Sequence, residues 1–220
     1  MKLGPGEPPA GPWRVEPIGW VTDTFAAAHM GVEGGPERPF VIAVDGRSAS
    51  GKTTLAEALS GHVPGSVVVH TDDVAWHHSF FDWGELMREG VLEPLRGGQA
   101  VSYRPPAWEN RGRSGAITVP AGCPAVFVEG VGSGRRELMP WIDALVWVQS
   151  DRDRAEEIGI ARDGGDQAAR DFWVEWMTAE DEFLDEDRPW ERADVIVAGN
   201  GDTVAHDPTA EVVVAPPLTD

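Results

Sequence analysis

The run Gly46-Arg47-Ser48-Ala49-Ser50-Gly51-Lys52-Thr53 has the residue types and the spacing of a phosphate-binding loop, G-x-x-x-x-G-K-[ST]. Its glycines let backbone N–H groups turn inward around phosphate oxygens. Lys52 brings a mobile positive charge to the β- and γ-phosphates, and the Thr53 hydroxyl is suited to Mg²⁺. We therefore predict a site for ATP and Mg²⁺ that is formed by Gly46, Arg47, Ser48, Ala49, Ser50, Gly51, Lys52, Thr53 and Thr54.

Three carboxylates follow short apolar runs and are candidates for catalysis and for metal binding. Asp72 and Asp73 come just after Val67–Val69, and Glu129 ends the run Ala125–Val128. A kinase that phosphorylates a hydroxyl often uses an Asp to accept or orient the proton, and we assign that role to Asp72. Helix capping is the alternative role for these aspartates. Glu129 and Asp73 are predicted, with Thr53, to hold Mg²⁺.

Basic and aromatic side chains further along the chain supply candidates for the remaining roles. An arginine over the phosphates would stabilise the charge that develops during transfer, and Arg154 and Arg162 are candidates, with Arg162 counted as catalytic. A solvated, charged start of a helix is the alternative for each. His77 and Trp108 are expected on the acceptor side, where Trp108 would stack on a flat ring, and Arg135 is expected to face an anionic group.

The elements that must position these residues follow from the apolar pattern. Continuous apolar runs predict buried strands at 40–44, 67–69, 125–128, 144–148 and 195–198, and helical spacing predicts helices at 52–60 and 166–185. In the second helix, Phe172, Trp176 and Phe183 share one face and are expected in the core. Strands alternating with helices predict an α/β protein: a three-layer α/β/α P-loop NTPase fold with a mainly parallel five-stranded sheet. In such sheets, ligands bind beyond the carboxyl ends of the strands.

Glycine and proline mark the boundaries of the predicted domain. Residues 1–38 are expected to be a Pro- and Gly-rich, partly ordered extension, with loose residues 1–12, an edge strand within 13–21, a helix capped by Asp23 and a linker at 31–39. Residues 39–200 are the predicted P-loop domain. Residues 201–220 form a tail that has room for an extra strand.

Composition limits the classes of partner and compartment. The chain has 220 residues, enough for one domain, and a formal net charge of −19, which opposes binding to nucleic acid. Cys123 is the only cysteine, so an intramolecular disulfide is excluded and a reducing cytoplasm is expected. We find no run of ~20 apolar residues and expect no contact with a membrane. No standard zinc-binding spacing is formed by His70, His77 and His78. The sequence leaves open whether the protein forms a homo-oligomer.

Taken together, these segments resemble the uridine kinase family and its relatives, from about Phe40 to Ala198. The similar stretches are Val44–Thr54, the strand-end Asp72-Asp73, Leu95–Tyr103, Val128-Glu129-Gly130 and Arg162-Asp163. The resemblance implies an ATP-dependent kinase that transfers the γ-phosphate to a hydroxyl of a small molecule, and it implies that this molecule is a nucleoside. It also implies that Asp72 is the base, that Tyr103 contacts the substrate and that Arg162-Asp163 belongs to a lid. Tyr103-Arg104-Pro105 departs from the family's Tyr-Asp-Phe, and Ile158 and Gly159 replace arginine-rich lid positions.

Other functions stay open on the sequence alone. A nucleoside monophosphate kinase would need several arginines around its acceptor, and Arg104, Arg111 and Arg113 are available for that. Arg104 is therefore also counted among the substrate-binding candidates. An antibiotic phosphotransferase and a nucleotide-dependent switch ATPase are the further alternatives.

Overall fold

The computed structural model describes residues 1–29, 38–201 and 204–218, so most of the linker expected at 31–39 lies outside the described residues. The strands are β1 (Arg14–Pro17), β2 (Phe40–Gly46), β3 (Val67–His70), β4 (Val101–Tyr103), β5 (Ile117–Val119), β6 (Ala125–Glu129), β7 (Ala144–Gln149), β8 (Val195–Ala198) and β9 (Glu211–Ala215). The helices are α1 (Gly19–His29), α2 (Lys52–His62), α3 (Thr71–Ala75), α4 (Gly84–Met87), η1 (Arg88–Leu92), α5 (Glu93–Arg96), α6 (Pro106–Asn110), η2 (Arg136–Trp141), α7 (Arg152–Arg162), α8 (Gln167–Asp187) and η3 (Pro189–Arg192).

The central sheet has the strand order β1-β9-β8-β7-β2-β6-β3. The five strands predicted from the sequence are β2, β3, β6, β7 and β8, and they pair in parallel. All five end at the same edge of the sheet, so the loops that follow them meet there. This confirms the predicted α/β class and places the phosphate loop, which follows the central strand β2, in the middle of that edge.

The predicted count of five strands is wrong, because the sheet has seven within the described part of the chain. The tail contributes β9, which runs antiparallel to β8, and β1 then pairs antiparallel with β9. The pairing of β1 with β9 joins segments almost 200 residues apart, which no local pattern can reveal. Asp23 also does not cap α1, since that helix begins at Gly19 and Asp23 lies inside it.

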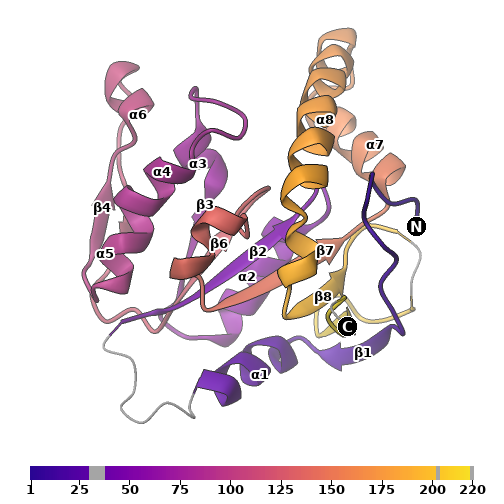
Figure 1. Ribbon diagram of the computed structural model, residues 1–220, viewed down its shortest axis with the longest axis horizontal. Helices are drawn as coiled ribbons and strands as arrows, with labels where there is room; N and C mark the ends of the chain where they lie inside the picture. The colour runs from indigo at the N-terminus through magenta and orange to yellow at the C-terminus, as the bar shows by residue number, and fades with distance from the viewer. Residues whose placement is uncertain (30–37, 202–203, 219–220) are drawn as a thin grey trace.

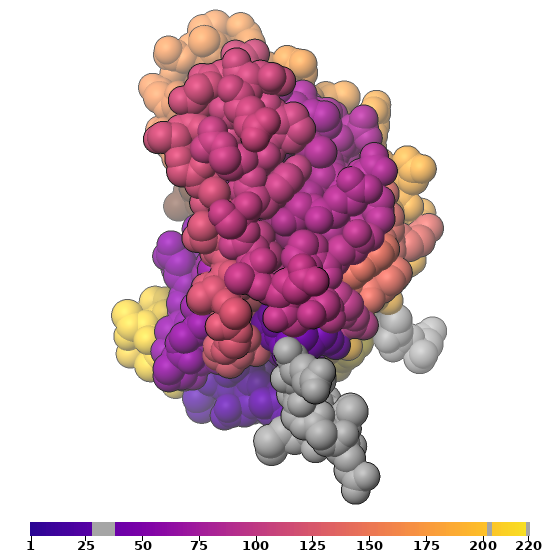
Figure 2. All heavy atoms as spheres, turned by 90° about the vertical axis from the view of Figure 1, so that its left-hand side faces the viewer, coloured from indigo at the N-terminus to yellow at the C-terminus, as the bar shows by residue number. Residues whose placement is uncertain are grey.

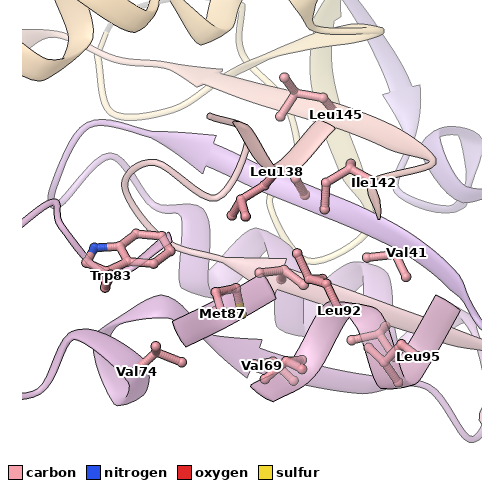
Figure 3. Close-up of a cluster of buried hydrophobic side chains, with 14 of the residues drawn as sticks. Val41, Val69, Val74, Trp83, Met87, Leu92, Leu95, Leu138, Ile142 and Leu145 are labelled. Atoms are coloured by element: carbon pink, nitrogen blue, oxygen red, sulfur yellow. The ribbon is translucent and has the colours of Figure 1, made fainter. Parts of the chain in front are cut away.

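Helices cover both faces of the sheet (Figure 1). On one face α1 and α2 pack against the sheet through Phe25 and Leu59, among other apolar side chains. On the other face lies the larger cluster, in which Met87, Leu92 and Leu138 pack over strand residues such as Val41 (Figure 3). Successive side chains of β2 alternate between the two clusters and are buried in both, which explains the unbroken apolar run of a central parallel strand.

The segment between α4 and β5 extends the domain beyond the sheet. Its two short strands, β4 and β5, form an antiparallel pair, and together with α4, α5 and α6 this segment covers most of one side of the molecule (Figure 2). Among the described residues, no helix combines the length and the apolar character that crossing a bilayer requires.

Candidate functional site

The phosphate loop connects β2 to α2 and has a conformation that depends on its glycines. Gly46 and Gly51 have φ angles of 151° and 102°, and Ala49 between them has a φ of 57°. A Cβ at Gly46 would lie 2.6 Å from the carbonyl oxygen of Val148 on the neighbouring strand β7. Lys52 Nζ donates a hydrogen bond to the carbonyl oxygen of Arg47 at 2.7 Å, so its ammonium group lies across the loop. This arrangement matches the predicted cradle for a polyphosphate.

Oxygen ligands lie beside the loop, where β6 ends. The Thr53 hydroxyl donates to Glu129 Oε2 at 2.9 Å, and His70 Nδ1 lies 3.2 Å from Glu129 Oε1. Burial raises the pKa of Glu129, but the hydrogen bond from His70 and the charge of Lys52 outweigh burial and leave the pKa below its usual range. A hydroxyl and an ionised carboxylate in contact are the ligands that suit Mg²⁺, so Thr53 and Glu129 fit the metal predicted here.

Asp72 lines the same cavity as Lys52, Glu129 and Arg162. It lies in the first turn of α3, directly after β3. Solvent reaches the Asp72 side chain through the cavity, but the surrounding protein desolvates its carboxylate, and this desolvation is the main cause that raises the pKa of Asp72; the charge of Lys52 opposes the rise and that of Glu129 adds to it. A carboxylate with a raised pKa that faces the phosphate loop is suited to accept a proton from an acceptor hydroxyl.

The cavity has a volume of about 630 Å³ and is lined by two chemically different groups of residues. One group belongs to the phosphate loop and consists of Ser48, Ala49 and Gly51–Thr54. The other group forms an aromatic wall and consists of Trp76, His77, Phe80, Trp83, Phe172, Trp173 and Trp176. One space therefore offers partners both to a polyphosphate and to a ring-bearing molecule.

Most indole N–H groups of the aromatic wall already donate hydrogen bonds within the protein. Trp83 donates to the carbonyl oxygen of Phe80 at 3.0 Å, and Trp173 donates to Asp163 Oδ2 at 2.8 Å. Trp176 donates to Ser48 Oγ at 2.7 Å. These three indole N–H groups are therefore not available for polar recognition of a ligand, and since Trp83 and Trp173 are nearly buried, stacking falls to the more exposed rings of the cavity, such as Phe172.

Arg162 is the predicted arginine that reaches the cavity. It ends α7, and its Nε pairs with Asp163 Oδ1 at 2.9 Å. The hydrogen bond to Asp163 raises the pKa of Arg162, so the guanidinium stays charged. Arg154 does not line the cavity; it forms an exposed pair with Glu157 at 3.1 Å.

Asp73, predicted as a metal ligand, points away from the cavity. Its carboxylate pairs with Arg113 Nη2 at 2.5 Å, and its carbonyl oxygen accepts from Trp108 Nε1 at 2.8 Å. The guanidinium of Arg113 lies 3.6 Å from the centre of the Trp108 ring. Arg104 in turn donates to the carbonyl oxygen of Arg113 at 2.8 Å. These residues form an internal network that holds α6 against α3, and none of the four lines the cavity.

Two further predicted substrate residues also lie outside the cavity lining. Tyr103 packs its ring against Gly90, where an added Cβ would lie 2.4 Å from the ring. Arg135 is buried, donates to the carbonyl oxygen of Phe81 at 2.6 Å, and lies 4.0 Å from the ring centre of Trp83. The side chains of both residues therefore contact other parts of the protein and do not point into the cavity. Of the substrate-binding candidates, Asp72 and His77 line the cavity.

Several cavity residues were not predicted from the sequence. Phe172 and Trp176 were expected in the core, but both line the cavity, and Phe172 is 44% exposed. Phe80 contacts Trp176 edge-to-face at 5.0 Å, so the loop after α3 is joined to α8 by aromatic contact. Asn200, after β8, also lines the cavity. The aromatic residues at helical spacing were visible in the sequence, but only their neighbours distinguish a core face from a cavity wall.

The described residues contain no group of three or more His, Cys, Asp or Glu side chains that could hold an ion. His70 is engaged with Glu129, while His78 Nε2 lies 2.7 Å from the carbonyl oxygen of Asp82.

Comparison with known proteins finds a partial sequence match and several structures of similar fold. No protein-family model matches the chain. Over 96 residues the chain is 34% identical to nicotinamide riboside kinase 1 of Mus musculus, a match that covers 41% of this chain and 49% of the mouse protein. The chain thus spans about half the length of the curated relative it matches.

Solved structures extend the similarity over most of the fold. A possible uridine kinase from Bacillus stearothermophilus has a TM-score of 0.51 at 21% identity, covering 80% of this chain and 98% of that one. The YGR205w protein has a TM-score of 0.54 at 11% identity, covering 91% and 99%. At these identities the likeness concerns the fold. The neighbours and the partial match together confirm that this chain has a P-loop kinase fold and resembles the uridine kinase-like proteins.

Proposed function

We propose that the protein is a phosphotransferase that moves the γ-phosphate of Mg²⁺·ATP to a hydroxyl group of a small, ring-bearing molecule. One observation carries the proposal: the phosphate loop and the carboxylate of Asp72 line a single cavity that also has an aromatic wall. The partial match to a nicotinamide riboside kinase supports it.

The roles follow from the contacts. Loop amides and Lys52 bind the phosphates, while Thr53 and Glu129 hold Mg²⁺. Asp72 takes the proton of the acceptor hydroxyl as its oxygen attacks the γ-phosphorus, and the bond to the β-phosphate oxygen breaks to release ADP. Arg162 stabilises the charge on the transferring group. Bound Mg²⁺ would neutralise charge on the phosphates as they react.

The acceptor that the cavity favours is a nucleoside. Its ring would stack among Trp76, Phe80 and Phe172, and its sugar hydroxyl would face Asp72 beside His77. Two of the similar proteins are a nicotinamide riboside kinase and a possible uridine kinase, so nicotinamide riboside and uridine are the first acceptors to test. We place this enzyme in the cytoplasm, because its single cysteine allows no intramolecular disulfide, as is typical of proteins in a reducing compartment.

A nucleoside monophosphate kinase is less well supported. Arg104 and Arg113, two of the arginines available for an acceptor phosphate, are engaged with backbone carbonyls and with Asp73 and do not line the cavity. Antibiotic phosphorylation would use the same groups and is distinguished only by the acceptor. A switch ATPase would hydrolyse ATP without any acceptor.

The test is an acceptor screen read by mass spectrometry. The protein is incubated with Mg²⁺·ATP and a panel of nucleosides, nucleoside monophosphates and aminoglycosides, and each acceptor is checked for the mass of one added phosphate. We expect a nucleoside to gain phosphate with the wild type and not with Lys52→Ala. Phosphate gain by monophosphates alone, or ATP hydrolysis without any acceptor product, would refute the proposal.

A further inference from the structure

Arg47, in the second position of the phosphate loop, is turned away from the cavity and is 1% exposed. Its guanidinium meets three carboxylates: Nη1 lies 2.6 Å from Asp181 and 3.4 Å from Glu180, both on α8, and Nε lies 3.6 Å from Glu7. The loop is therefore bound on its outer side, opposite the phosphates. A side chain held by three buried or half-buried anions fixes the backbone that carries it.

The carboxylate of Glu7 comes from the N-terminal segment, residues 1–10, which runs along the molecule to β1 (Figure 1). Glu7 Oε1 accepts hydrogen bonds from Trp147 Nε1 at 2.8 Å and from Gln149 Nε2 at 3.1 Å, both on β7. Its side chain is fully buried. The segment is also fixed at its beginning, where the carbonyl oxygen of Lys2 accepts from the backbone N–H of Arg152 at 2.8 Å.

Backbone and shape add to the charge contact. A Cβ at Gly4 would lie 1.5 Å from Arg47 Nη2, so the main chain of the segment lies directly on the guanidinium. From the other side, Glu180 Oε1 accepts from the backbone N–H of Ser48 at 2.7 Å. The N-terminal segment and α8 therefore hold neighbouring residues of the loop.

The loop needs such support because its conformation is unfavourable for an unattached chain. Ala49 has a positive φ of 57°, which costs a non-glycine residue free energy that the surrounding structure must compensate. A loop held in its binding conformation before the nucleotide arrives loses less conformational entropy on binding.

We propose that residues 1–10 act as a strap that positions the phosphate loop through the contact of Glu7 and Gly4 with Arg47, so that Glu7 is a positioning residue for nucleotide binding. The inference rests on the proposed function for the identity of the nucleotide. None of residues 1–10 lines the cavity, so the strap acts from outside the proposed binding site.

Two variants test the strap by different means. Glu7→Gln keeps the size of the side chain and removes its charge, while Gly4→Ala keeps all charges and inserts a methyl group where the guanidinium lies. Glu16→Gln is the matched control, since Glu16 lies on β1 and pairs only with Arg14, at 2.9 Å, among the described contacts. Hydrogen–deuterium exchange of residues 44–54 without nucleotide measures the hold on the loop, and calorimetry measures the Kd for Mg²⁺·ATP.

We expect faster exchange in the loop and a Kd raised roughly tenfold in both variants, within the usual range for coupling between separate parts of a protein. The KM for ATP should rise while the KM for the acceptor stays the same, a split that a general loss of structure would not produce. The Glu16→Gln protein should behave as the wild type.

The strap is refuted if Glu7→Gln and Gly4→Ala fold with wild-type loop exchange and wild-type Kd, or if both KM values rise together. If Glu7→Gln does not fold, the loop exchange and the Kd of Gly4→Ala decide whether the strap positions the loop. A wild type without affinity for Mg²⁺·ATP would refute the proposed function, and the exchange comparison would still decide whether the segment holds the loop.

Discussion

Replacing Asp72 by asparagine is the sharpest test of the proposed chemistry, because it changes charge and basicity with little change in shape. Asp72 faces the phosphate loop across the cavity, and the amide of asparagine cannot accept the hydroxyl proton. Loss of a general base lowers kcat by about 10²- to 10⁴-fold. At 1.36 kcal/mol for each factor of ten, this corresponds to about 2.7 to 5.4 kcal/mol of transition-state stabilisation.

The pH dependence gives a second, independent readout of the same variant. Because desolvation raises the pKa of Asp72, the wild type should lose kcat/KM as the pH falls through a value above the usual range for Asp. This acidic limb should be missing from the residual activity of Asp72→Asn. The assay is a steady-state measurement of ADP release with the nucleoside concentration varied up to saturation, from pH 5 to 9.

The neighbouring residue supplies the control. Asp73→Asn makes the same chemical change at a carboxylate that pairs with Arg113 and does not line the cavity, so kcat should stay close to that of the wild type. Full turnover by Asp72→Asn, or equal losses in the two variants, would refute the assignment of the base.

Three further outcomes are expected. Lys52→Ala should abolish measurable Mg²⁺·ATP binding in calorimetry, and wild-type affinity would contradict the site. Gly159→Ala should lower the free energy of unfolding, measured in urea, by about 1–3 kcal/mol, because the new Cβ would lie 1.9 Å from the indole ring of Trp173 on α8. Gly61→Ala is the control: it has open space around it and should raise the free energy of unfolding by about 0.4–1 kcal/mol. A less stable Gly61→Ala than Gly159→Ala would be inconsistent with this packing. The hydrogen bond to Glu129 raises the pKa of His70. The stability that this pair adds is therefore complete below pH 6.5 and is lost as the pH rises through the raised pKa. The difference in unfolding free energy between wild type and His70→Gln should shrink over that range, and a constant difference would argue against the pair.

Local sequence was sufficient for the phosphate loop and its strand and helix. The loop's glycines, Lys52 and Thr53 are consecutive or nearly so, and the apolar run 40–44 and the helix from Lys52 follow from neighbouring residues. Glu129 was found in the same way, because it ends a buried strand. Where the geometry of a site depends on residues close in sequence, residue type and spacing determine it.

The choice between Asp72 and Asp73 needed the tertiary structure. Both follow β3 in the first turn of α3, and successive residues of a helix point about 100° apart. Which one faces the cavity is decided by Arg113, 40 residues further along, which draws Asp73 to the other side. In the same way, helical spacing predicted that Phe172 and Trp176 lie in the core, whereas in the fold these two side chains of α8 line the cavity.

The sequence by itself therefore determined the parallel sheet, the phosphate loop and the carboxylate that ends β6, since these depend on short-range patterns of burial and backbone freedom. Only the tertiary structure decided the edge strands, the direction of Arg47 and the aromatic wall of the cavity. The physical reason is distance along the chain: Arg47 is held by Glu7 and by residues of α8 more than 130 positions away, and contacts between such remote segments leave no periodic trace in the sequence.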